Sequence, residues 1–377
     1  MNLEALAAAM AEPDPSSLGA GERLRARFGA DDAAWALTQA ALRRRGLMKF
    51  GRASEMLFTS DGVEQATRDS VRRWRAERFR EAGVGEVWDL GCGIGADAMA
   101  FAEAGIRVHA VDADEATARV AAFNLALVGG AAASVGLAED VAVPSTGAVF
   151  LDPARRGAHG RTWRVADFTP PWSLVLDHLT SERFTCVKLG PGLPKELIPD
   201  GVRASWVSDG GDVVEVSLWN RLSPGVGAVL LGVAEEPVTV WRPAGEAAVE
   251  LPVAPLGRFV HEPDGAVIRA GVIGEALAGA DAWLLDGQVA YVSTDSPLDS
   301  PSMTSFEVLD VLDYDVRALR AWVRANRVGT LEIKKRAIDV DPAELRRRLK
   351  PSGRASATVI LARTNDGTRA IVARRLR

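Results

Sequence analysis

The spacing of apolar residues changes along this 377-residue chain, and each change predicts a different kind of structure. Over residues 1–80 apolar positions recur at helical spacing, which predicts an N-terminal helical region. We expect its last helix to run from about residue 61 to residue 81. A polar and cationic stripe follows one face of that helix, at Gln65, Arg68, Arg72 and Arg75. The stripe fits either an ordinary solvated face or a surface that closes over a ligand.

From residue 86 onward, short apolar runs alternate with helical stretches. Seven runs are typical of strands: 86–90, 107–111, 132–136, 148–151, 184–189, 203–208 and 213–219. Such alternation predicts parallel βαβ units and a doubly wound, Rossmann-like α/β sheet of seven strands. Only the turn at 208–212 separates the last two runs, so we expect the seventh strand to be antiparallel.

Beyond residue 222 the apolar runs become short and lie among Pro and Gly. We expect strands at 226–233, 238–241 and 258–260, a helix near 264–279 and a loop at 293–302. Further on we expect helices at 315–326 and 341–350, a strand at 328–333, and a hairpin of 357–363 with 369–374. The predicted parts are an N-terminal helical region (1–80), the sheet domain (81–221), a small α+β connecting domain (222–310) and a basic α+β domain (311–377).

The composition narrows the class of protein. Apolar and charged fractions of 47% and 25% are those of a soluble globular chain. Two Cys and four His, without metal-ligand spacing, predict no metal site. The N-terminus lacks the basic start of a signal peptide and no apolar run is long enough to span a bilayer. We therefore expect a cytoplasmic protein with no membrane partner.

Charge is distributed unevenly. Residues 311–377 carry 17 Lys and Arg against 7 Asp and Glu, and residues 41–80 carry 11 against 5. Residues 81–310 carry 14 against 32. Solvated helix faces account for the excess at 41–80, whereas the C-terminal excess favours contact with nucleic acid.

A glycine-rich turn follows the first predicted strand. Gly91, Gly93 and Gly95 remove side chains where the backbone must turn and approach a ligand closely, and the helix after them presents free N–H groups. Asp112, at the end of the next strand, is placed to accept hydrogen bonds from two ribose hydroxyls. Asp89 precedes the glycines, where a carboxylate would meet a cation such as a methionine ammonium. These residues predict a nucleotide-like cofactor.

The same glycines are compatible with two kinds of cofactor. Gly91-x-Gly93-x-x-Ala96 also satisfies the dinucleotide pattern, with an acid at about the expected distance. The third glycine at Gly95 and the acid at Asp89 favour S-adenosylmethionine over a nicotinamide, because Asp-x-Gly-x-Gly-x-Gly resembles the loop of class I methyltransferases.

A second motif follows the strand at 148–151. Asp152 and Pro153 lie at its carboxyl end, where open α/β sheets bind ligands. We expect Asp152 to accept a hydrogen bond from the substrate and Pro153 to stiffen the turn. Arg155 and Arg156 would project at the mouth of the site, where guanidinium groups suit phosphate or a base edge. The alternative is a surface turn with two solvated arginines.

Five motifs spread over nearly the whole chain carry a family resemblance. They are Asp89-Leu-Gly-Cys-Gly-Ile-Gly95, Asp152-Pro-Ala-Arg-Arg-Gly157, Lys188-Leu-Gly-Pro-Gly192, His261-Glu-Pro-Asp264 and Leu331-Glu-Ile-Lys-Lys-Arg336. With them the chain resembles bacterial class I S-adenosylmethionine-dependent methyltransferases that carry a C-terminal THUMP-like domain. Because THUMP domains are RNA-binding modules, the resemblance implies an RNA methyltransferase acting on tRNA or rRNA.

The motifs also narrow the chemistry. Exocyclic-amine methyltransferases show an aromatic after Asp/Asn-Pro-Pro, whereas Ala154 and Arg155 stand there. RNA 5-methyluridine enzymes need a nucleophilic cysteine where this chain has Leu189, and Cys186 lies within an apolar strand. We therefore expect direct methyl transfer, with Asp152 holding or deprotonating the acceptor.

Other expected contacts follow from the same reading. Asp140, or alternatively Glu139, would bind the adenine amino group, and the C-terminal cations would anchor RNA: Lys334, Lys335, Arg336, Arg346, Arg347 and Arg348. Two alternatives remain. One is a non-catalytic nucleic-acid-binding protein on a methyltransferase scaffold, and the other is a methyltransferase of small molecules or proteins.

Overall fold

The computed structural model describes residues 1–130, 133–155 and 164–376, and the chain forms two compact units. The first comprises Met1–Arg203 and Val216–Pro224, and the second comprises Ala204–Glu215 and Gly225–Arg377. Strand β9 (Asp212–Trp219) therefore contributes residues to both. In the described part of the chain, no helix is long and apolar enough to cross a membrane.

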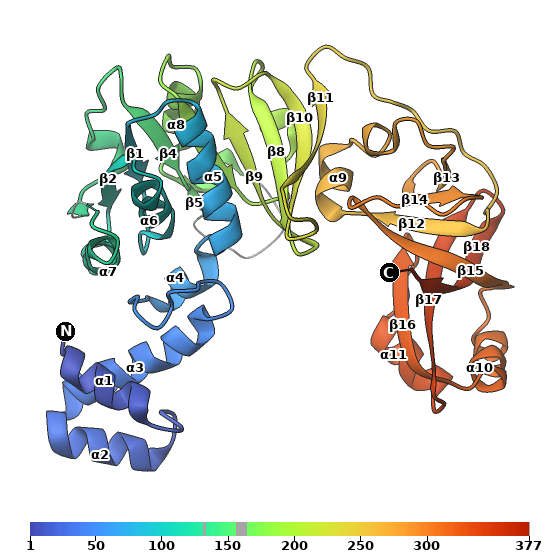
Figure 1. Cartoon of the computed structure of the whole chain (residues 1–377), viewed down its shortest axis with the longest axis horizontal. Helices are drawn as coiled ribbons and strands as arrows, with labels where there is room; N and C mark the ends of the chain where they lie inside the picture. Colours follow the sequence, from blue (N-terminus) through green and yellow to red (C-terminus); the bar gives the residue numbers. More distant parts are fainter. Residues whose placement is uncertain (131–132, 156–163, 377) are drawn as a thin grey trace. The chain divides into compact units, whose positions relative to one another are not determined.

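The first unit begins with five helices, coloured blue in Figure 1. They are α1 (Leu3–Ala11), α2 (Leu18–Phe28), α3 (Ala30–Gly46), α4 (Ser60–Gln65) and α5 (Asp69–Glu81). Side-chain oxygens of Asn2, Ser17 and Thr59 cap three of them by accepting backbone N–H groups. Such caps satisfy donors that the first helical turn leaves free, which explains where these helices start.

The single helix predicted for 61–81 is wrong. The backbone is extended at Ala66 and Arg68, so the chain forms α4 and α5 with a break between them. In the break the Thr67 hydroxyl donates to Asp97 Oδ2 at 2.7 Å. Of the cationic stripe, Arg72 and Arg75 are buried rather than solvated. A tertiary contact therefore decides the break, and the stripe faces inward.

A mostly parallel sheet forms the body of the first unit, with strands in the order β9-β7-β4-β1-β2-β3. Its parallel strands are β1 (Glu86–Leu90), β2 (Arg107–Asp112), β3 (Ser134–Val135), β4 (Ala148–Leu151) and β7 (Thr185–Leu189). β9 pairs antiparallel with β7, with Cys186 opposite Trp219, which confirms the expected reversal. The short strands β5 (Ala154–Arg155) and β6 (Phe168–Thr169) pair separately.

Helices connect these strands. They are α6 (Ala96–Glu103), α7 (Glu115–Ala126), α8 (Trp172–Leu179) and the 3₁₀ turns η1 (Ala138–Asp140), η2 (Val165–Asp167) and η3 (Lys195–Leu197). Residues Ala96 to Phe101 of α6 are all buried. The alanines that dominate this helix let it pack closely against both α5 and the sheet, since a small side chain allows a close approach of backbones.

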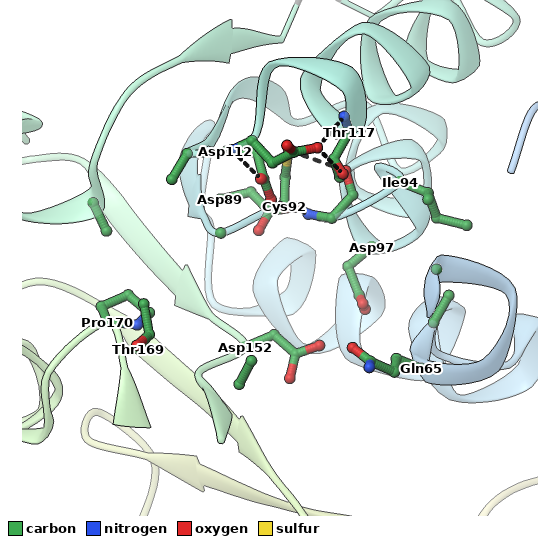
Figure 2. A pocket seen from close by; sticks show the side chains of 18 of the residues that line it. Gln65, Asp89, Cys92, Ile94, Asp97, Asp112, Thr117, Asp152, Thr169 and Pro170 are labelled. Carbon is green, nitrogen blue, oxygen red and sulfur yellow. Dashed lines mark hydrogen bonds between the residues drawn. The ribbon is translucent and has the colours of Figure 1, made fainter. Parts of the chain in front are cut away.

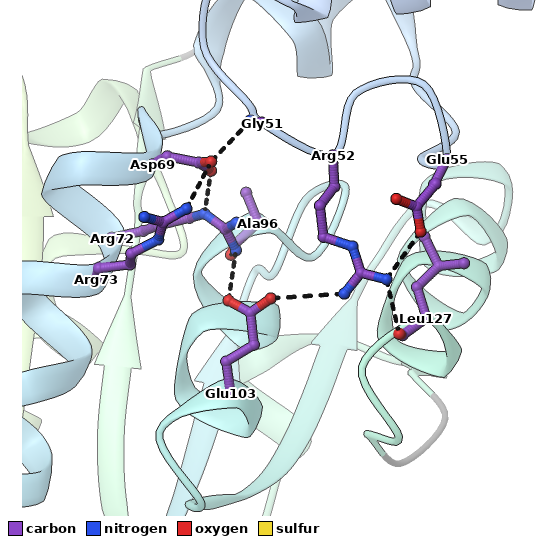
Figure 3. Close-up of polar contacts among 9 residues, drawn as sticks. All are labelled: Gly51, Arg52, Glu55, Asp69, Arg72, Arg73, Ala96, Glu103 and Leu127. Atoms are coloured by element: carbon purple, nitrogen blue, oxygen red, sulfur yellow. Dashed lines mark hydrogen bonds and ion pairs between the residues drawn. The ribbon is translucent and has the colours of Figure 1, made fainter.

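Polar contacts fasten the N-terminal helices to this sheet domain (Figure 3). Glu103, at the end of α6, forms ion pairs with Arg72 at 3.7 Å and with Arg52 at 3.8 Å. Arg52 also donates to the carbonyl of Leu127 at 3.2 Å. Asp69 accepts from Arg72 and from the backbone of Gly51.

The second unit starts with β8 (Arg203–Asp209), the first half of β9, β10 (Gly225–Leu231) and β11 (Val238–Pro243). It continues with a seven-stranded sheet in the order β13-β14-β12-β15-β18-β17-β16. These strands are β12 (Phe259–Pro263), β13 (Trp283–Asp286), β14 (Val289–Thr294), β15 (Met303–Asp313), β16 (Val328–Arg336), β17 (Ala355–Thr364) and β18 (Gly367–Arg375). Its helices are α9 (Gly265–Ala270), η4 (Glu275–Leu277), α10 (Val316–Ala325) and α11 (Pro342–Leu349).

Here the structure differs from expectation in two places. The helix expected near 264–279 ends at Ala270, because Gly271 adopts the left-handed conformation (φ 74°) that terminates helices. Strands β13, β14 and β15 were not predicted, and β15 pairs with both β12 and β18. This sheet therefore draws strands from both sides of the boundary expected at residue 310.

The buried amide of Asn124 on α7 joins two loops of the first unit. Its Nδ2 donates to the carbonyls of Leu57 (2.9 Å) and Ile94 (2.8 Å), and its Oδ1 accepts the Leu57 N–H at 2.8 Å. Ile94 belongs to the glycine turn, so this side chain ties the turn to the N-terminal region. A buried polar group with all its partners satisfied fixes one arrangement.

We predict that Asn124→Ala lowers the free energy of unfolding by about 3 kcal/mol, because buried partners lose their hydrogen bonds. The measurement is urea unfolding followed by circular dichroism. Arg119→Ala on the same helix is the control. It breaks the exposed Arg119–Glu115 ion pair and should cost less than about 0.5 kcal/mol. Equal losses in both variants would contradict the role assigned to Asn124.

Candidate active site

A cavity of about 350 Å³ lies in the first unit at the carboxyl ends of β1, β2 and β4. This volume falls within the range of small-molecule sites. The glycine turn and η1 form part of its lining, and α4 supplies further lining residues. In Figure 2 the side chains of Asp89, Asp97, Asp112 and Asp152 surround this hollow, with Gln65 of α4 beside them. The cavity thus joins residues of both predicted motifs.

The glycines of the turn have two different roles. Gly91 (φ 86°) and Gly93 (φ 55°) are left-handed, and a Cβ on either would meet no described atom within 4 Å. Their backbone is therefore open to a ligand in the cavity. Gly95 (φ 79°) instead packs on α7, where a Cβ would lie 3.3 Å from Ala121. Glycine is needed at all three positions because other residues rarely adopt this conformation.

Asp89 is fully buried, and neither of its carboxylate oxygens has a hydrogen-bond partner among the described residues. Burial raises its pKa well above the ordinary value, and the nearby carboxylates of Asp97 and Asp152 raise it further. A buried carboxylate without a partner is costly. Because Asp89 lines the cavity, a cationic group of a ligand would offset that cost.

The side chain of Asp112 stabilises the turn. Its Oδ2 accepts the Gly93 N–H and its Oδ1 accepts the Asp114 N–H, both at 2.9 Å. Burial raises the pKa of Asp112, whereas these two hydrogen bonds lower it. Each carboxylate oxygen can accept a second hydrogen bond, so Asp112 can also receive hydroxyl groups of a ligand.

Asp152 forms an ion pair that the sequence analysis missed. Strands β4 and β7 are parallel with Leu151 opposite Val187, so the next residues, Asp152 and Lys188, are neighbours. Lys188 Nζ lies 2.5 Å from Asp152 Oδ2. Burial raises the pKa of Asp152, and the Lys188 ammonium opposes that rise. The sequence did contain a signal for this pair, because the motifs that begin at Asp152 and at Lys188 both lie at the ends of adjacent strands.

The other predicted site residues of the first unit are distributed as follows. Pro153 is buried directly after Asp152, and the backbone of Arg155 pairs with Phe168. Arg156 lies outside the described residues. Asp140 is exposed and does not belong to the described lining of the cavity, whereas its neighbour Glu139 does.

Residues of α4 and α6 also contribute, although they were not among the predicted site residues. Thr59, Gln65 and Asp97 line the cavity. Asp97 is held by the Thr67 hydroxyl and by an ion pair with the buried Arg75. Only Gln65 had a signal in the sequence, through the stripe that could close over a ligand.

The predicted RNA-binding residues lie in the second unit and differ in their surroundings. Lys334 and Arg336 form ion pairs with Glu262, at 2.6 Å and 3.2 Å. The Arg346 side chain donates to the Leu331 carbonyl. Exposed side chains occur at Lys335, Arg347 and Arg348.

A mainly parallel sheet with an antiparallel strand beside β7, a glycine turn after β1 and an acid after β2 define a class I methyltransferase. Comparison with known proteins supports this class. The family model described as THUMP domain-like matches residues 303–375. Two curated relatives, from Mycobacterium tuberculosis strains H37Rv and CDC 1551, are each named an uncharacterized S-adenosylmethionine-dependent methyltransferase. Each is 34% identical over 361 residues, covering 92% of this chain and 96% of the relative.

A crystal structure from Porphyromonas gingivalis W83, of a candidate methyltransferase, shares the fold. Its TM-score is 0.77 at 18% identity, over 100% of this chain and 99% of that one. The chain belongs to the family of S-adenosylmethionine-dependent methyltransferases with a THUMP-like C-terminal domain. Its cofactor is S-adenosylmethionine. The Asp89 carboxylate, to which none of the described residues donates a hydrogen bond, and the open backbone of Gly91 and Gly93 fit such a group.

We predict that Asp112→Ala weakens binding of S-adenosylmethionine at least about tenfold, because hydrogen bonds to a carboxylate are among the stronger ones. Isothermal titration calorimetry measures this. Asp177→Ala, the same change on the exposed face of α8, is the matched control and should bind as the wild type does. Unchanged affinity in Asp112→Ala would remove Asp112 from the cofactor site.

Proposed function

We propose that this methyltransferase transfers a methyl group directly to a nucleobase of RNA, with tRNA or rRNA as the substrate. The observation that carries the proposal is that the carboxylates of Asp89, Asp112 and Asp152 line one cavity, with Asp152 held by an ion pair with Lys188. The choice of RNA is supported by the THUMP-like match and by the basic excess of residues 311–377.

The cofactor contacts follow from the chemistry of the lining. Asp89 would receive the methionine ammonium, because it is a buried carboxylate with no hydrogen-bond partner in the described part of the chain. Asp112 would accept the ribose hydroxyls, and the Gly91 and Gly93 backbone would lie against the ligand. Glu139 replaces Asp140 as the residue proposed for the adenine amino group, since it lines the cavity. Bound S-adenosylmethionine supplies a methyl group activated by a sulfonium.

Asp152 would act on the acceptor. Its raised pKa makes it a stronger base than an exposed aspartate, while Lys188 keeps it ionised and holds one oxygen in place. Pro153 would stiffen the turn, and Arg155 and Arg156 would grip the substrate. These roles position the acceptor for an in-line attack.

The cysteines support direct transfer over a covalent mechanism. Cys186 is fully buried in β7, within the core of the sheet. Cys92 lines the cavity, but burial raises the pKa of its thiol well above the ordinary value. A nucleophilic cysteine needs the opposite shift.

We predict that the wild-type protein transfers labelled methyl groups from S-adenosylmethionine to RNA isolated from cells that lack this protein. Asp152→Asn should lower kcat about a hundredfold, because general-base catalysis contributes on that scale. Nucleoside mass spectrometry identifies the product. Label found only in protein or small molecules would contradict the RNA proposal. Cofactor binding without any transfer would favour the scaffold alternative.

The pH dependence tests the Asp152–Lys188 pair. A base acts when ionised, so kcat/KM should fall as the pH drops through the pKa of Asp152, which burial raises. Lys188→Met removes the charge that opposes this rise, so the fall should begin at a higher pH. Lys188→Arg keeps the charge and should keep the wild-type profile. Identical profiles in all three proteins would exclude the pair from catalysis.

A further inference from the structure

A second hollow lies in the second unit, between α10 and the turn that follows α11. It has a volume of about 1140 Å³, and six of its twelve described lining residues are cationic while none is acidic. We call it the cationic cleft, and its cations are Arg317, Arg320, Arg324, Arg327, Lys350 and Arg354.

Helix geometry places half of these cations on one face. Arg317, Arg320 and Arg324 are separated by three and four residues, which puts them one above the other along α10. The helix is held in the domain because Leu319 and Val323 are buried in the core, and Val323 also lines the cleft. The packing of the helix therefore keeps the three arginines along the cleft.

The other side of the cleft is held by its backbone. Ser352 and Gly353 both donate to the Val328 carbonyl, at 2.9 and 3.1 Å. A Cβ on Gly353 would lie 1.5 Å from the carbonyl oxygen of Arg327, so only glycine fits there. Arg327 and Lys350 adopt left-handed conformations, both with φ 51°. Such a conformation costs free energy in a residue with a side chain, and the tight turn maintains it.

Among the described residues, the cations of the cleft lack the acidic partners that other cations of the second unit have. In the same unit Arg363 pairs with Asp286, and Lys334 pairs with Glu262. Among the described residues, no ion pair links a cation of the cleft to a carboxylate. Like charges at these helical spacings repel one another. A bound polyanion would remove that repulsion.

We propose that the cationic cleft binds successive phosphates of an RNA strand. From Arg317 to Arg324 the helix rises about 10 Å, a span that favours several anionic groups over one. Arginine, which supplies five of the six cations, binds phosphate through two parallel N–H donors. RNA rather than another polyphosphate rests on the proposed function, whereas the phosphate recognition rests on the cleft itself.

The cationic cleft places the RNA contact in a different part of the THUMP-like domain from the residues that the sequence predicted. All six cations lie within the matched residues 303–375. Lys334 and Arg336, which were expected to bind RNA, are instead engaged with Glu262. An ion pair already made inside the protein must be broken or shared before either side chain can hold a phosphate.

The test measures binding of the full chain to a fluorescein-labelled 20-nucleotide RNA by fluorescence anisotropy, from 50 to 200 mM salt. We expect Arg320→Ala with Arg324→Ala to bind on the order of tenfold more weakly and to lower the slope of log K against log salt by about 1.4, the loss of two phosphate contacts to a single strand. Arg258→Ala with Arg269→Ala removes the same charge outside the cleft and should leave both quantities unchanged.

Further arms separate the alternatives. Arg347→Ala with Arg348→Ala should lose less affinity than the cleft variant, and an equal or greater loss would overturn the proposal. The proposal would also be overturned if the cleft variant bound RNA as the wild type does. The same holds if the cleft cations were needed for binding to phosphatidylserine vesicles but not for binding to RNA. Unchanged circular dichroism and cofactor binding show that the variant is folded. If the protein binds RNA through the cleft but transfers no methyl group to it, only the proposed function is contradicted. If the protein methylates RNA and the cleft variant binds RNA normally, only the proposal of the cleft is contradicted.

Discussion

The buried ion pair between Arg75 and Asp97 is the interaction on which the site depends. Asp89, Asp97 and Asp152 lie near one another: the Asp97 carboxylate raises the pKa of both other acids, and Asp152 also raises the pKa of Asp89. Arg75, itself buried with its guanidinium over the Phe150 ring at 4.8 Å, lowers both. If one charge is removed from such a group of buried ionised side chains, the remaining charges are left uncompensated. One inward-facing cation thus allows several carboxylates to lie around the same cavity.

The same ion pair makes the N-terminal helices part of the site. Arg75 lies on α5 and Asp97 on the first turn of α6, and Thr67 in the break between α4 and α5 donates to the same carboxylate. The break therefore sets where α4 ends, and the capping residue Thr59 and Gln65 of α4 both line the cavity. Chain segments far apart in sequence enclose the cavity because one buried carboxylate joins them.

Local patterns predicted those parts of the structure that local chemistry decides. Strands form at all seven runs expected between residues 86 and 219, although β8 belongs to the second unit. These strands, the turn at Gly91–Gly95 and the strand-end positions of Asp89, Asp112 and Asp152 follow from apolar runs and glycines. The break at Thr67, the burial of Arg72 and Arg75 and the pairing of Lys188 with Asp152 did not, since each depends on a partner distant in sequence. Strand β15 was missed for a related reason: its charged residues Glu307, Asp310 and Asp313 recur at every third position and break the two-residue period of a strand, and its neighbours β12 and β18 decide its place.

The two units show why a count of charges does not locate an anion site. Arginines of α5 look like a solvated stripe in the sequence, yet Arg75 pairs with the buried Asp97 and Arg72 donates to the carbonyl of Ala96 at the start of α6. In the second unit the run at Lys334–Arg336 is a conspicuous basic segment, yet two of its three side chains pair with Glu262. Arg317, Arg320 and Arg324 are spread over eight positions and form no run, but the helix brings them together without an acid. An anion site is therefore identified by the cations that the fold leaves without acidic partners. Only these cations gain free energy when they contact a phosphate.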